Sequence, residues 1–149
     1  MKRFKFTLEA LARVYTAKQE EKQRALAQAQ RSLREAESVL VAAAVEYERC
    51  QNDEAVLRDK GETVVQMRLF VQYAFELKQR IERQKKVITE RLKEVNLARK
   101  ILLDASRRVK ALDQLKERRF GEWKKSRVRW ERAFTDEINQ LRFVRVGQS

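Results

Sequence analysis

Apolar residues in the first third of the chain recur at alternating intervals of three and four positions. In each of four successive heptads, one position carries Leu or Tyr and the other carries a small residue. The pairs are Leu26 and Ala29, Leu33 and Ala36, Leu40 and Ala43, and Tyr47 and Cys50. This spacing keeps one face of a helix turned towards a partner and is typical of a coiled coil. It predicts a long helix over residues 7–58.

A second stripe with the same spacing runs from Met67 to Leu112, and only Gln84 and Arg91 interrupt it. Between the stripes, Gly61 suits the left-handed position that follows a helix end, and the segment 63–66 has the spacing of a capping box. We therefore predict a turn over residues 59–63 and a second helix over residues 64–146. A connection this short makes the helices antiparallel neighbours. The expected fold is all-α, an antiparallel coiled-coil hairpin within one elongated domain, 1–149.

The register of the hairpin follows from folding the chain back near residue 62, so that the numbers of facing residues add to about 124. Ala36 then faces Ile88 and Ala43 faces Ile81. Small residues on one helix meet large ones on the other, which allows close approach without voids.

The second helix is predicted to be longer than the first and to project beyond it. With Phe4 beside Phe120, the chain after about residue 123 has no partner on the first helix. The projecting part is nevertheless apolar on one face. That face carries Phe120, Trp123, Trp130, Phe134, Ile138 and Leu141. Large aromatic side chains are seldom left fully exposed to solvent. We therefore expect this face to contact either a second copy of the chain or a partner protein.

Another apolar cluster lies just after the turn, where apolar residues surround the second helix instead of forming a stripe. Phe70, Ala74 and Leu77 belong to the heptad stripe that faces the first helix, which we call the seam. The residues left partly exposed are Leu69, Val71, Tyr73 and Phe75. They either close the end of the hairpin or form an interaction site, since exposed apolar clusters mark such sites.

Charge is distributed unevenly along the chain, which has a net charge of +13. Residues 7–60 carry nine basic and ten acidic side chains, whereas residues 62–149 carry twenty-three basic and twelve acidic ones. The basic pairs at 107–108, 118–119 and 124–125 raise nucleic acid as a ligand. Their alternation with acidic residues favours a solvated helix face instead.

The residue types needed for most catalysis are missing. The chain has no histidine and a single cysteine, Cys50, which lies on the seam, so histidine acid–base chemistry, a metal-binding cysteine cluster and an internal disulfide are excluded. Paired carboxylates lie among basic neighbours and not in a desolvated pocket. We expect no catalytic or metal site, no cofactor, no small-molecule substrate, no secretory signal and no membrane span. The chain is interpreted as a protein that is soluble, or at most peripheral at a membrane, and that is not an enzyme.

Three segments resemble the FliJ family, the stalk of the bacterial flagellar type III export apparatus. They are the opening Phe4–Leu11, the segment Phe70–Gln84 near the turn, and Leu112–Phe120 followed by Glu122–Lys125. The resemblance extends over nearly the full length. It implies a cytoplasmic stalk, peripheral at the inner membrane, whose termini enter the pore of the hexameric export ATPase. The other end would reach the membrane export gate, and the family also handles export chaperones.

The resemblance also implies where these partners bind. In the second helix, the family's gate-binding positions fall on Tyr73, Leu77, Arg80 and Gln84, and we add the nearby Phe70. In the first helix they fall near Val39, Ala43, Glu46 and Cys50, where the family often has aromatic or larger residues. Tyr47 lies one position away, and we include it among the expected gate residues. The residues expected at the ATPase ring are Phe120, Trp123, Arg127, Trp130, Phe134 and Ile138.

Three alternatives remain open at the level of sequence. The equivalent stalk of an injectisome is the nearest one. A basic coiled coil that binds nucleic acid is a second, and its DNA affinity would fall steeply with salt. A purely structural homodimer is the third.

Overall fold

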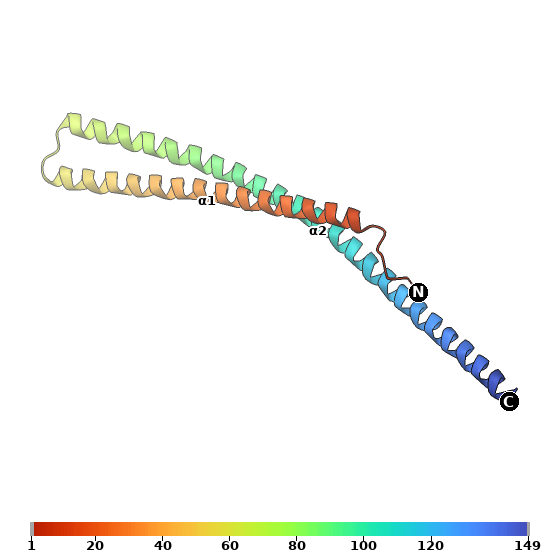
Figure 1. Ribbon diagram of the computed structural model, residues 1–149. Helices are drawn as coiled ribbons and strands as arrows, with labels where there is room; N and C mark the ends of the chain where they lie inside the picture. Colours follow the sequence, from red (N-terminus) through yellow and green to blue (C-terminus); the bar gives the residue numbers. More distant parts are fainter. Residues whose placement is uncertain (1, 149) are drawn as a thin grey trace. The chain divides into compact units, whose positions relative to one another are not determined.

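The computed structural model describes residues 2–148 and consists of two long helices packed as a hairpin (Figure 1). Helix α1 spans Glu9–Asp59 and helix α2 spans Val64–Gly147. The predicted all-helical hairpin with a longer second helix is therefore confirmed. The helix bounds differ from the predicted ones by two residues at most, because Thr7 and Leu8 form a turn before α1 begins.

The connection between the helices has the chemistry expected from its sequence. Gly61 has a φ of 92°, a left-handed conformation that glycine adopts without steric cost. At the start of α2, the backbone amide of Thr63 donates to Oε1 of Gln66 at 3.0 Å, and the amide of Gln66 donates to Oγ1 of Thr63 at 3.2 Å. These reciprocal bonds form a capping box. They satisfy two amides at the helix start and fix where α2 begins.

The chain divides into two compact units, which are described separately. The loop unit spans Glu20–Leu103 and contains the turn between the helices. The terminal unit contains the chain up to Gln19 together with the chain from Asp104 onward. The expectation of a single elongated domain stays a prediction.

The core of the loop unit joins small residues of α1 to large residues of α2. Ala36, Ala43 and Cys50 are buried on α1, and Leu77 and Val95 are fully buried on α2. All five occupy predicted seam positions, so the heptad pattern identified the core of this unit correctly. Small side chains on one helix allow the axes to approach closely around the large ones on the other.

The seam prediction was wrong at Met67, which is 44% exposed. Met67 lies in the first turn of α2, where no earlier helical turn covers it.

The two polar residues in the stripe have distinct roles. The side-chain amide of Gln84 donates to the backbone carbonyl of Ala36 across the seam at 2.9 Å. The guanidinium of Arg91 instead pairs with Glu94 on its own helix at 3.2 Å.

Two polar contacts of the terminal unit agree with the predicted register. In the terminal unit, Nε2 of Gln19 donates to Oγ of Ser106 at 3.0 Å, and Nζ of Lys116 pairs with Oε2 of Glu9 at 3.0 Å. The residue numbers of each pair add to 125, close to the predicted 124. A slip of one heptad would change that value by seven. The facing of individual seam residues, such as Ala36 and Ile88, stays a prediction.

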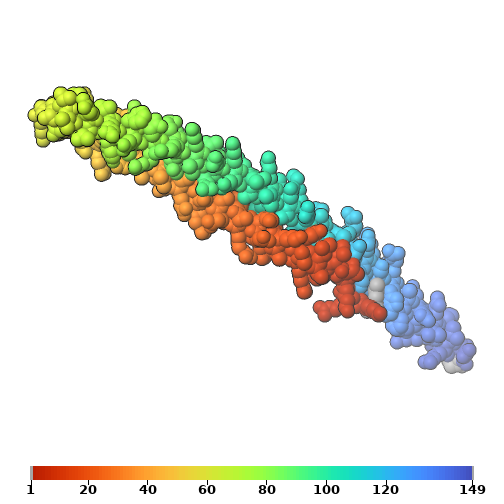
Figure 2. Space-filling model, turned by 90° about the horizontal axis from the view of Figure 1, so that it is seen from above, coloured from red at the N-terminus to blue at the C-terminus, as the bar shows by residue number. Residues whose placement is uncertain are grey.

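Within the terminal unit, the last part of α2 carries large exposed apolar side chains. Figure 2 shows this part, in blue, without another segment over the visible face. Phe134 is 50% exposed and Phe143 is 80% exposed. No helix in the described part of the chain is both long and apolar enough to cross a bilayer.

Candidate functional site

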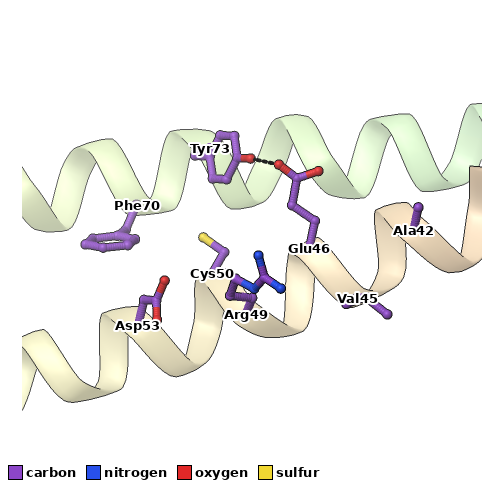
Figure 3. Close-up of a pocket in the computed structure, with 8 residues that line it drawn as sticks. All are labelled: Ala42, Val45, Glu46, Arg49, Cys50, Asp53, Phe70 and Tyr73. Atoms are coloured by element: carbon purple, nitrogen blue, oxygen red, sulfur yellow. Dashed lines mark hydrogen bonds between the residues drawn. The ribbon is translucent and has the colours of Figure 1, made fainter.

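A shallow groove of about 490 Å³ crosses the two helices of the loop unit near Cys50 (Figure 3). In Figure 3 the thiol of Cys50 points towards α2, between the rings of Phe70 and Tyr73. The lining residues are Ala42, Val45, Glu46, Arg49, Cys50, Asp53, Phe70 and Tyr73. The groove thus combines two aromatic rings from α2 with a row of charged and small side chains from α1.

Glu46 is the polar centre of this groove. Its carboxylate accepts a hydrogen bond from the hydroxyl of Tyr73, and it lies 3.9 Å from the guanidinium of Arg80. The hydrogen bond to Glu46 is the main cause that raises the pKa of Tyr73 above its ordinary value, because an ionised phenol could no longer donate it. One carboxylate on α1 therefore holds two side chains of α2 that were predicted to bind the export gate.

Cys50 is part of the core beneath the groove and is not an activated thiol. Burial raises the pKa of the Cys50 thiol, and the nearby carboxylates of Glu54, Asp53 and Glu46 raise it further. A thiol of this kind stays protonated at neutral pH and reacts slowly. The groove therefore offers shape and hydrogen bonding, not nucleophilic chemistry.

The other predicted gate residues differ in accessibility. Tyr47 and Phe70 are half-buried; the hydroxyl of Tyr47 accepts a hydrogen bond from Gln51 at 2.6 Å, and Nζ of Lys78 lies 5.6 Å from the centre of its ring. Leu77 is fully buried in the seam and is not accessible to a partner while the helices are packed. Its role in this fold is to pack in the core beneath the predicted gate residues.

A second hollow of about 330 Å³ adjoins the groove towards the turn. Its lining residues are Leu57, Gln66, Leu69, Phe70 and Tyr73. Leu69, Val71 and Phe75 are each about 60% exposed, so the apolar cluster after the turn does not close the end of the hairpin completely. The predicted set of gate residues lacked both Glu46 and Leu57. Glu46 was marked only as a position near the family's site, and Leu57 continues the seam of α1.

The terminal unit contains a cluster of three aromatic rings. The ring of Phe4, in the segment before α1, lies 5.2 Å from that of Phe120 and 5.9 Å from that of Trp123. Phe120 and Trp123 stack on each other with ring centres 5.8 Å apart. The indole N–H of Trp123 also donates to the backbone carbonyl of Lys2 at 3.2 Å. The predicted neighbourhood of Phe4 and Phe120 is therefore confirmed.

The segment before α1 is fixed further by Phe6, which is buried. Nζ of Lys116 and the guanidinium of Arg119 lie about 6 Å from the centre of its ring, a distance at which cations are attracted to aromatic faces. Arg119 also donates to the hydroxyl of Thr7 at 2.9 Å. The sequence singled out Phe4 through the register but did not place Phe6 in the core. Phe6 lies before the helix, where periodicity carries no information.

Beyond the cluster, the predicted ring-binding residues are more exposed. Trp130 and Phe134 stack with ring centres 5.4 Å apart, and about half of each side chain is exposed. Arg127 pairs with Glu131 at 2.8 Å and lies over the ring of Trp123. Ile138 is half-buried. These residues form a stacked aromatic face with a fixed guanidinium beside it.

A comparison with protein families gives a match to the family described as flagellar FliJ protein, over residues 4–148. The chain belongs to the flagellar FliJ family. No curated protein and no solved structure matches it. FliJ proteins are non-enzymatic coiled-coil components of the flagellar export apparatus, with the role of a stalk. The match covers both units, including the groove at Cys50 and the aromatic cluster at Trp123.

Family membership also helps to choose between the alternatives that the sequence left open. The matched family is flagellar, which favours the flagellar apparatus over an injectisome. An export-apparatus role implies partners of that apparatus, such as its ATPase.

Proposed function

We propose that this FliJ protein links the ring of the flagellar export ATPase to the membrane export gate. In this proposal the terminal unit binds the ring and the loop unit binds the gate. The protein works in the cytoplasm, peripheral at the inner membrane, and assists export chaperones. The observation that carries the proposal is that each unit has its own exposed aromatic surface in a chain of this family.

The ring contact is supported by the stacked, half-exposed Trp130 and Phe134. Tryptophan and other aromatic side chains dominate the binding energy of protein interfaces because each buries a large area. The basic residues around them steer a partner and set its orientation more than they add affinity. Together these features suit a surface that enters a protein-lined pore.

The gate contact is supported by the groove at Cys50 and the adjoining hollow. Phe70 and Tyr73 line both, Tyr73 is the more exposed of the two, and its hydroxyl donates a hydrogen bond to Glu46. A tyrosine fixed in this way loses little conformational freedom on binding. We propose Tyr47, Phe70, Tyr73, Arg80 and Gln84 as the gate surface, with Leu77 supporting it from the core.

Co-purification with the hexameric export ATPase tests the ring contact. The chain is expected to retain the ATPase and stimulate it, and removal of residues 130–149 is expected to abolish both effects. This deletion keeps Trp123 and so leaves the cluster with Phe4 in place. Leu97→Ala, a change of an exposed residue in the loop unit, serves as the control. Normal stimulation by the shortened chain would contradict the proposal.

A further inference from the structure

The aromatic cluster of the terminal unit borders a groove of about 670 Å³ that involves the segment before α1. Its lining residues are Arg3, Phe4, Phe120, Trp123, Lys124, Arg127, Val128 and Glu131. We propose that the segment before α1 and helix α2 together form a binding groove for a short acidic peptide segment that carries an apolar anchor residue. This inference deepens the proposed ring contact and rests on it for the identity of the protein that supplies the peptide.

The walls of the groove come from two separate parts of the chain. Phe4 contributes one wall and is held by its contacts with Phe120 and Trp123. The indole N–H of Trp123 is bonded to the backbone of Lys2, which fixes the segment at a second point. Because the segment is already fixed, little conformational entropy is lost when a ligand binds in the groove. The volume of the groove lies within the range of about 300–1,000 Å³ that is typical of ligand-binding clefts.

The charge of the groove favours an anion. Arg127 is paired with Glu131, so these two side chains largely cancel. Arg3 and Lys124 line the same groove and have no carboxylate partner among the ion pairs of residues 2–148. Two cations beside an apolar floor suit a peptide in which a carboxylate stands next to an apolar side chain.

The arrangement of the rings favours a peptide over nucleic acid. Single-stranded nucleic acid binds by stacking its bases on open aromatic faces. Here Phe120 and Trp123 stack on each other, Nζ of Lys124 lies 4.8 Å from the centre of the Phe120 ring, and the guanidinium of Arg127 lies 5.6 Å from that of Trp123. The faces are thus occupied.

Nuclear magnetic resonance of the full chain tests this proposal, because its two indole N–H groups report on two different surfaces. The Trp123 indole lies in the groove and the Trp130 indole lies in the adjacent stack, and Trp130→Phe assigns the signals. The probe is a short peptide of alternating glutamate and leucine. We expect a saturable shift of the Trp123 signal, no shift when lysine replaces glutamate, and a much smaller one when serine replaces leucine.

Variants of the groove complete the test. Phe4→Ala is expected to weaken binding of the peptide about tenfold. Arg3→Glu, an exposed change that leaves the rings in place, should also weaken it, whereas Arg13→Glu, which makes the same charge change in α1 outside the groove, should not. Equal losses in Arg3→Glu and Arg13→Glu, a shift confined to Trp130, or a stronger response to single-stranded DNA than to the peptide would overturn the proposal.

Measuring ATPase binding by the same variants separates this inference from the proposed function. If the chain binds the peptide at Trp123 but does not retain the ATPase, the proposed ring contact is contradicted and the proposed peptide groove is supported. Retention of the ATPase together with no response of Trp123 to the peptide would overturn the groove alone.

Discussion

The hydroxyl of Tyr73 on α2 donates a hydrogen bond to the carboxylate of Glu46 on α1. This contact crosses the hairpin at the groove where the gate surface is proposed. The contact fixes the orientation of the Tyr73 ring, although Tyr73 is 40% exposed. The surface offered to a partner therefore depends on a polar contact between the helices as well as on the apolar seam beneath it.

The first prediction concerns the ionisation of Tyr73. In a Tyr15→Phe, Tyr47→Phe background, the remaining phenol is expected to titrate above the ordinary tyrosine pKa of about 10. Glu46→Gln should lower that midpoint towards the ordinary value, because the carboxylate that favours the protonated phenol is gone. Since the folded-state pKa is raised, the stabilising contribution is complete at neutral pH and is lost as the pH rises through the titration. Ultraviolet absorbance of tyrosinate measures the midpoint, and an unchanged value in Glu46→Gln would contradict the contact.

The second prediction assigns Leu77 to the core. Leu77→Ala should lower the free energy of unfolding by about 2–5 kcal/mol, because the side chain is fully buried and its removal leaves a cavity. Leu92→Ala, at an exposed position of the same helix, should change it by about 0.5 kcal/mol or less. Chemical denaturation followed by circular dichroism gives both values. Similar small effects of the two substitutions would show that Leu77 is not part of the core.

The third prediction tests close approach of the helices at Ala36. Ala36→Leu should destabilise the chain by about 1–3 kcal/mol, because a larger side chain does not fit a buried seam position bonded across to Gln84. Ala44→Leu makes the same change at an exposed position of α1 and should be nearly neutral. An unchanged melting temperature in Ala36→Leu would argue against the predicted facing of Ala36 and Ile88.

The fourth prediction concerns the reactivity of Cys50. Its thiol should react slowly with iodoacetamide at neutral pH and rapidly after unfolding in urea, because burial raises its pKa and restricts access. A cysteine introduced by Val45→Cys in a Cys50→Ala background should react at the rate of a free thiol, since position 45 is exposed. The raised pKa also means that stability falls as the pH rises above the ordinary thiol value of about 8.5. Equal rates for the two cysteines would contradict the buried position.

The sequence predicted the hairpin because its signals are local and repeated. Heptad spacing, Gly61 and the capping box at Thr63 and Gln66 each indicate the same architecture, and the structure confirms all three. The seam also identified Leu77 as a core residue. The family resemblance placed the same residue on the gate surface, and its burial shows why periodicity is the better guide to accessibility at that position.

Side-chain contacts at the two surfaces were less predictable. The bond between Tyr73 and Glu46 depends on rotamers of residues that lie outside the seam, and heptad spacing says nothing about them. The burial of Phe6 depends on a segment without regular secondary structure. Gln84 was an interruption of the stripe in the sequence, and only its bond to the carbonyl of Ala36 explains its place in the seam.

The fifth prediction tests the central claim, that one chain links the export ATPase to the export gate. The measurement is retention of the ATPase on an immobilised cytoplasmic domain of the gate protein, with and without the chain. Retention is expected only when the chain is present. Tyr73→Ala should prevent capture of the chain by the gate domain, and a Trp130→Ala, Phe134→Ala chain should still be captured but should no longer retain the ATPase. Val87→Ala, at an exposed position of α2 outside the groove, should behave as the parent. Displacement of the chain from the gate domain by the ATPase would contradict the account.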